Sequence, residues 1–115
     1  MSMELYQELQ KLTGQLEKSI KALRQNGTAY AEAERDYKIL LRTECLKMRD
    51  EGVAIGVITL TCYGIPSVAD ARFKRDCAEA VYKANQEAIA SIKLQLRLIE
   101  NQIQREWSAT GVGNL

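Results

Sequence analysis

The sequence lacks histidine altogether, and its 115 residues include only one proline, one tryptophan and three cysteines. Without histidine the chain has neither the commonest general base nor the Ser-His and Cys-His nucleophile pairs, and most zinc and iron sites are excluded. It also contains no phosphate-binding glycine loop and no calcium-loop motif. We therefore predict a protein that is not an enzyme, with no catalytic residues, no metal site and no cofactor.

Neither sign of charge is in excess, because 16 basic residues face 15 acidic ones. Net charge therefore predicts neither nucleic-acid nor membrane binding. The most apolar stretch, residues 53–65, is far shorter than the ~20 residues that span a bilayer. The first residues lack the basic and apolar regions of a signal peptide. We expect a cytoplasmic protein that does not bind membranes.

The cysteines are Cys45, Cys62 and Cys77, and their spacing matches no CxxC metal site. We interpret all three as small buried hydrophobic residues in a reducing compartment.

A heptad repeat runs through the first half of the chain. One row is Leu9, Leu16, Leu23, Tyr30 and Tyr37, and its companion is Leu5, Leu12, Ser19, Asn26, Ala33 and Leu40. This spacing is that of a helical packing seam, in which Ser19 and Asn26 would fix the register or produce a kink. Asn26-Gly27 normally indicates a turn, but the seam keeps its phase across it. We predict one helix over residues 2–51, and two helices broken at Gly27 are the alternative.

A second long helix follows an apolar corner. Gly52 is a typical residue for the C′ position of a helix end, and a short helix is predicted over residues 55–63. Ser67 is expected to cap the second helix, with Asp70 completing a near-capping box. Its seam consists of Tyr82, Ile89, Leu96 and Ile103 with Ala78, Asn85, Ile92 and Ile99, and the helix reaches Trp107.

The predicted fold class is all-α: a long antiparallel coiled-coil-like helical hairpin with a short connecting helix. We predict a single helical-hairpin domain over residues 1–107 and a flexible C-terminal tail over 108–115. Val81, Leu94 and Leu98 lie off the second seam, so the apolar surface is wider than one neighbouring helix covers. A homo-oligomer is therefore expected.

Basic residues gather on one side of the first helix and at the start of the second. Arg35, Lys38, Arg42 and Arg49 fall within about 60° of one another around the helix axis. Arg72, Lys74 and Arg75 form the second group. The favoured interpretation is a solvated face whose cations pair with Asp36, Asp76 and Glu79, and the alternative is a surface that contacts phosphates or an acidic protein.

Aromatic and apolar residues flank the same corner. Tyr63 and Phe73 are expected to plug the end of the hairpin, and the alternative is an exposed recognition surface beside arginines. The candidate partner-binding residues are Arg35, Lys38, Arg42, Arg49, Tyr63, Arg72, Phe73 and Arg75.

Three segments together carry a resemblance to a known group of proteins. They are AEAERDYKILL (31–41), ARFKRDCAEAVY (71–82) and LRLIENQIQREW (96–107), and they resemble small uncharacterised helical proteins of phages and prophages of Gram-positive bacteria. The resemblance implies a product acting in the host cytoplasm on host defence or on host or phage nucleic-acid machinery.

We therefore expect a non-enzymatic phage-type binding protein, for example an inhibitor of a CRISPR or other anti-phage system that blocks a surface or sequesters a ligand. Its partner would be a host or phage protein or nucleoprotein complex. One alternative is a DNA-binding accessory factor in phage replication or recombination, and another is a structural scaffold oligomer.

Overall fold

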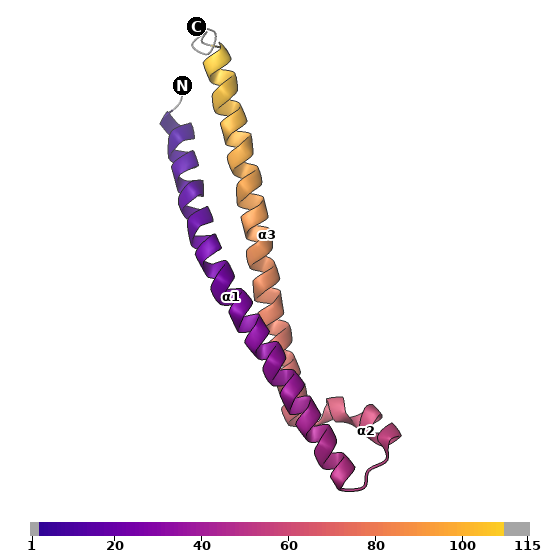
Figure 1. Cartoon of the computed structure of the whole chain (residues 1–115). Coiled ribbons are helices and arrows are strands. Elements are labelled where there is room, and N and C mark those ends of the chain that lie inside the picture. The colour runs from indigo at the N-terminus through magenta and orange to yellow at the C-terminus, as the bar shows by residue number, and fades with distance from the viewer. Residues whose placement is uncertain (1–2, 110–115) are drawn as a thin grey trace. The chain divides into compact units, whose positions relative to one another are not determined.

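The computed structural model describes residues 3–109, and its regular elements in that range are all helical (Figure 1). Helix α1 spans Met3–Asp50, α2 spans Ile55–Thr61, the 3-10 helix η1 spans Cys62–Gly64 and α3 spans Pro66–Ala109. The predicted all-α fold, with two long helices joined by a short one, is confirmed. None of the helices over residues 3–109 is long and apolar enough to cross a membrane.

Within the described residues the chain forms two compact units. Unit 1 combines residues 3–24 of α1 with residues 84–109 of α3, and unit 2 comprises residues 25–83. Helices α1 and α3 each contribute to both units, whereas α2 and η1 belong to unit 2 alone.

In unit 1 the two helical segments pack along the predicted seam. Leu12 and Ile92 are buried there, and the other seam residues of the unit are half-buried. A polar contact crosses the seam, because the Asn85 side-chain amide donates to the Ser19 carbonyl oxygen at 3.0 Å. The Asn85 side chain thus joins the two helices through the backbone of Ser19.

In unit 2 the second half of α1 packs against the start of α3, and α2 and η1 complete the core. The buried side chains are Tyr37, Ile58, Cys62 and Val68, of which Val68 is fully enclosed. Each comes from a different element, so the core of this unit depends on the corner as well as on the seam.

Helix α1 continues without a break through Asn26-Gly27, so the prediction of one helix is confirmed. The side chain of Tyr82 lies against Gly27, where an added Cβ would be 3.1 Å from the Tyr82 Cε1 atom. Gly27 therefore leaves room for the Tyr82 ring and does not form a turn.

Helix α1 ends at Asp50, and Gly52 takes the predicted C′ position with a φ of 84°. The Gly52 amide donates to the Arg49 carbonyl and the Val53 amide to the Met48 carbonyl, both at 3.0 Å. These two bonds make a Schellman motif, with glycine at the left-handed position.

The predicted cap of α3 is wrong. The helix begins at Pro66, and the Ala69 amide donates to the Ile65 carbonyl at 2.9 Å, so Ile65 occupies the N-cap position and Ser67 lies inside the first turn. Proline suits the first helical position because its fixed φ is helical and the missing N–H would have no partner there. Asp70 pairs instead with Lys74, at 3.3 Å.

Two further predictions concern the tail and the cysteines. Helix α3 includes Ser108 and Ala109, and the rest of the predicted tail lies outside the described residues.

Cys62 is buried and Cys45 half-buried, but Cys77 is exposed, so the prediction of three buried thiols is wrong for Cys77. It lies outside the α3 seam, which its neighbour Ala78 occupies.

Candidate protein-binding surface

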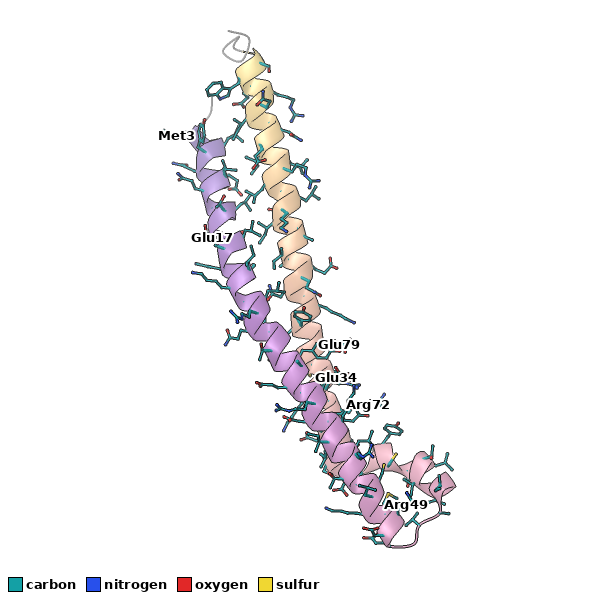
Figure 2. All side chains as sticks on the ribbon, viewed as in Figure 1. Met3, Glu17, Glu34, Arg49, Arg72 and Glu79 are labelled. Carbon is teal, nitrogen blue, oxygen red and sulfur yellow. The ribbon has the colours of Figure 1, made fainter. Side chains whose placement is uncertain are left out.

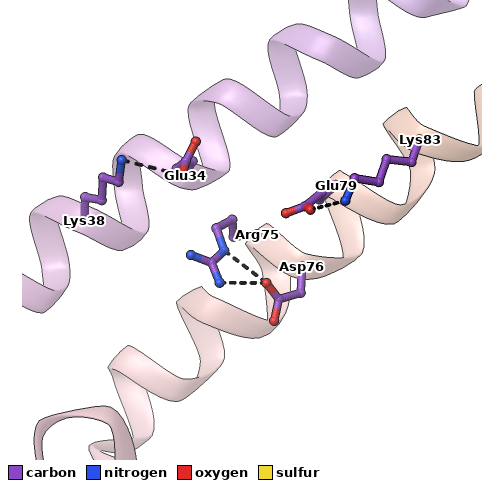
Figure 3. Close-up of polar contacts among 6 residues, drawn as sticks. All are labelled: Glu34, Lys38, Arg75, Asp76, Glu79 and Lys83. Carbon is purple, nitrogen blue, oxygen red and sulfur yellow. Dashed lines mark hydrogen bonds and ion pairs between the residues drawn. The ribbon is translucent and has the colours of Figure 1, made fainter. Parts of the chain in front are cut away.

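All eight candidate residues lie in unit 2, and Figure 2 labels Arg49 and Arg72 among them. Two of the α1 cations are held by neighbouring carboxylates. The Arg35 Nη2 atom lies 3.1 Å from the Asp36 Oδ1 atom, and the Lys38 Nζ atom lies 3.6 Å from the Glu34 Oε1 atom (Figure 3). Arg35 and Lys38 are thus exposed cations paired with carboxylates of their own helix, as the solvated-face interpretation expected.

Arg75 points inward and serves the packing of unit 2. Its guanidinium lies over the Tyr37 ring at 4.6 Å from the ring centroid, and its Nε and Nη2 atoms donate to Asp76 Oδ1 at 3.0 and 2.8 Å (Figure 3). The bonds to Asp76 raise the pKa of Arg75. Because Tyr37 belongs to α1 and Arg75 to α3, this contact joins the two helices and is not available to a partner.

A second group of polar side chains also joins α1 to α3. Tyr30 of α1 lies beside the Glu79 carboxylate of α3. Glu79 pairs with Lys83 at 2.7 Å (Figure 3). The hydrogen bond to Glu79 raises the pKa of Tyr30, while the bonds from Lys83 and Tyr30 lower the pKa of Glu79. Glu79 thus bonds to α1, whereas the solvated-face interpretation placed it among surface charges only.

Arg42 and Arg49 differ from these cations, since neither forms an ion pair with any residue in the described range 3–109. Ile39 and Leu46 lie on the same side of α1 and are exposed. Around the helix axis, Cys45 is about 60° from Arg42 and about 40° from Arg49. Because Cys45 is half-buried, the two arginines flank the partly buried side of α1.

Tyr63 and Phe73 do not plug the end of the hairpin, so that prediction is wrong. Tyr63 is 48% exposed and Phe73 is 67% exposed. The Arg72 guanidinium lies 5.6 Å from the centroid of the Tyr63 ring, which places a cation from α3 over an aromatic ring from η1. Val68 and Ile58 fill the core instead, and the aromatic residues remain at the surface.

Helix α2 presents an apolar face that the sequence-based site prediction missed. It buries only Ile58, while Leu60 lies about 160° around the axis and is 84% exposed. Ile55 and Val57 are exposed as well. The available signal was the absence of any charged residue between Glu51 and Asp70.

We group the exposed apolar and basic residues of this corner under one name, the apolar–basic surface. It consists of Ile55, Val57, Leu60 and Tyr63 from α2 and η1 together with Arg42, Arg49 and Arg72. Apolar side chains beside arginines, exposed on short and long helices of one unit, have the composition of protein-binding hot spots.

Unit 2 also contains a groove between α1 and α3. Its lining residues are Ala29, Glu32, Ala33, Asp36, Leu40, Ser67, Asp70, Ala71 and Lys74. Asp36 and Asp70 are already paired with Arg35 and Lys74. No group of three potential metal ligands occurs among residues 3–109, so the groove offers no assembled metal site within that range.

Comparison with known proteins adds no relative, since no family model, curated protein or solved structure matches the chain.

Proposed function

We propose that the chain is a non-enzymatic binding protein that docks a partner protein on its apolar–basic surface. The observation that carries the proposal is the exposure of Leu60 and Ile55 on a helix with no charged residue of its own. Val57, which is also exposed, lies about 60° from Leu60 around the α2 axis, and exposed apolar side chains that lie together mark interaction sites. The partner that fits has an apolar pocket for α2, with carboxylates around it that meet Arg42, Arg49 and Arg72.

The resemblance to phage proteins suggests the biological setting of this activity. The partner would then be a component of host defence or of the nucleic-acid machinery, and binding would block its surface. A chain that acts by occupying a surface needs rigid helices and exposed side chains, and it needs no catalytic groups.

Direct DNA binding has less support. Six cations of unit 2 form ion pairs with carboxylates: Arg35, Lys38, Lys47, Lys74, Arg75 and Lys83. Phosphate contacts would have to displace these carboxylates. Affinity for an oligonucleotide at about 50 mM salt, falling steeply with added salt, would favour the DNA-binding alternative.

The test is capture of a partner from host lysate by the wild-type protein, followed by measurement of its Kd for variants. Leu60→Asp and the double variant Arg42→Glu/Arg49→Glu should each raise the Kd by about 30-fold or more, as hot-spot substitutions do. The matched controls in unit 1 are Ile20→Asp and Arg97→Glu/Arg105→Glu, which alter an exposed aliphatic residue and two exposed arginines. If the variants bind as tightly as the controls, the partner does not use this surface and the proposal fails.

A further inference from the structure

The outer side of α1 in unit 2 exposes two large aliphatic side chains. Ile39 is 59% exposed and Leu46 is 49% exposed, whereas Tyr37 is the buried residue that α1 contributes to this unit. Around the helix axis, Ile39 lies about 160° from Tyr37 and Leu46 lies about 180° from it, so both face away from the core. The packing of unit 2 therefore does not account for either residue.

Arginines repeat along the same side of α1 with the same period. Ile39 and Leu46 are seven residues apart, and so are Arg42 and Arg49, which alternate with them along the chain. All four are exposed, and they fall within about 80° of one another around the axis. Spacings of three and four residues are those of a helix-packing seam. Helix α1 thus has a second seam, which we call the outer seam.

The outer seam has charge to offer a partner. Arg42 and Arg49 form no ion pair with another residue of the described range 3–109. The seam also borders a shallow groove along α1, whose lining residues are Lys38, Ile39, Leu41, Arg42 and Cys45. A partner that covers Ile39 and Leu46 removes water from the neighbouring arginines, and a cation that loses water without gaining an anion is costly. Such a partner must therefore bring carboxylates to the arginines.

We propose that the outer seam docks an amphipathic helix of the partner protein, with aliphatic residues against Ile39 and Leu46 and carboxylates against Arg42 and Arg49. Two helices packed side by side repeat their contacts every seven residues, as this seam does. From Ile39 to Arg49 the seam extends about 15 Å, which engages about three turns of the partner helix. Phosphates would satisfy the arginines but leave the aliphatic side chains in water, so the seam fits a protein better than a nucleic acid.

This inference rests on the proposed function, because Arg42 and Arg49 belong to the apolar–basic surface, and it adds the structure and chemistry of the partner segment. The two proposals can fail separately. Leu60→Asp on α2 tests the proposed function with the captured partner, whereas synthetic peptides test the outer seam without one.

The experiment measures the binding of two alanine-rich helical peptides of about three heptads to the full-length protein by fluorescence anisotropy. Each peptide has leucine at one seam position of every heptad, and the other seam position is glutamate in one peptide and lysine in the other. Wild type should bind the glutamate peptide at least about tenfold more tightly than the lysine peptide, because like charges across an interface repel. In Arg42→Glu/Arg49→Glu the preference should reverse.

Ile39→Ser/Leu46→Ser tests the aliphatic half of the outer seam. This variant should bind the glutamate peptide at least about tenfold more weakly than wild type, because it removes two apolar contacts. Since both positions are exposed, its circular dichroism and Tm should match those of wild type. The matched control is Ile20→Ser, at an exposed position in unit 1, which should leave peptide binding unchanged.

Three results would overturn the proposal. One is equal affinity of wild type for the two peptides, or no binding of either. Another is an oligonucleotide that Ile39→Ser/Leu46→Ser binds as tightly as wild type does while Arg42→Glu/Arg49→Glu does not bind it, because the arginines would then hold phosphates. The third is dimerisation of wild type that Ile39→Ser/Leu46→Ser abolishes, which would assign the outer seam to a second copy of the chain.

Discussion

The ring of Tyr82 on α3 lies against the backbone of Gly27 on α1, close enough that a Cβ at Gly27 would be 3.1 Å from its Cε1 atom. The same ring also meets Tyr30, with centroids 6.0 Å apart. Gly27 therefore accommodates an aromatic side chain from the opposite helix within unit 2. This contact explains why a residue that weakens helices occurs in the middle of α1.

Substitution of Gly27 tests this contact. Gly27→Ala should give a free energy of unfolding at least about 1 kcal/mol lower than Gly14→Ala, because both gain helix propensity but only Gly27→Ala crowds a packed ring. Gly14 is a matched control, since a Cβ there meets nothing within 4 Å. Urea denaturation provides the measurement. In a Tyr82→Ala background, Gly27→Ala should become stabilising, and equal effects in both backgrounds would contradict the steric explanation.

Asn85 provides a second test, in unit 1. Asn85→Ala should lower the free energy of unfolding by about 1 kcal/mol, because it removes the hydrogen bond from the side-chain amide to the Ser19 carbonyl. The exposed Asn101→Ala is the control and should change stability by less than about 0.5 kcal/mol. Asn85→Leu should retain its stability through apolar packing. Amide hydrogen exchange of this variant should nevertheless show that the register between the two helices is less specific than in wild type. An unchanged exchange pattern would show that Asn85 does not set the register.

The Tyr30–Glu79 hydrogen bond predicts an effect on titration. The pKa of Tyr30 is raised above 10.0 by Glu79, so Glu79→Gln should lower the Tyr30 pKa toward that value. The difference in absorbance between wild type and Tyr30→Phe isolates this tyrosine from the other four. A Tyr30 pKa that does not respond to Glu79→Gln would contradict the assigned bond.

The same carboxylate predicts a dependence of stability on pH. Because the folded-state pKa of Glu79 lies below 4.5, its contribution is present above pH 4.5 and is lost as the pH falls through the lowered value. Wild type should therefore have a higher Tm than Glu79→Gln at neutral pH, and the difference should shrink in acid. Glu87→Gln, at an exposed site with no ion pair within residues 3–109, is the control and should show no such trend.

Helix α2 allows a comparison of an inward with an outward side chain. Ile58→Ala should cost about 2–4 kcal/mol of stability, because it removes the one buried side chain of this helix. Leu60→Ala should change stability by less than about 0.5 kcal/mol while weakening partner binding. Urea denaturation together with amide exchange in α2 distinguishes the two. Equal losses would mean that Leu60 also supports the fold.

Self-association is a separate proposal that rests on the exposed side chains off the α3 seam. Leu94 and Leu98 are 52% and 57% exposed, and we propose that they contact a second copy. Light scattering at micromolar concentration should then give an oligomer for wild type and a monomer for Leu94→Ser/Leu98→Ser. A monomeric wild-type protein would remove this proposal without affecting the one for the apolar–basic surface.

The helices and their seams follow from the spacing of residues along the chain. The heptad spacing of Leu9, Leu16 and Leu23 requires only the 3.6-residue period of the helix, and the φ of Gly52 is a local property of its backbone. The continuity of α1 through Gly27 followed from the same period. These features are local, and local regularities can be read along the chain.

The roles of the corner residues depend on contacts between different helices. Ser67 resembles a cap in the sequence, but the helix begins at Pro66 and Ile65 occupies the N-cap position. Arg75 and Arg42 look alike in the sequence, yet Arg75 lies over Tyr37 while Arg42 remains at the surface without an ion pair in the described range. The burial of Ile58 and the exposure of Leu60 depend on how α2 packs within unit 2. Side-chain roles at such a corner are set by contacts between elements, and no spacing along one helix encodes them.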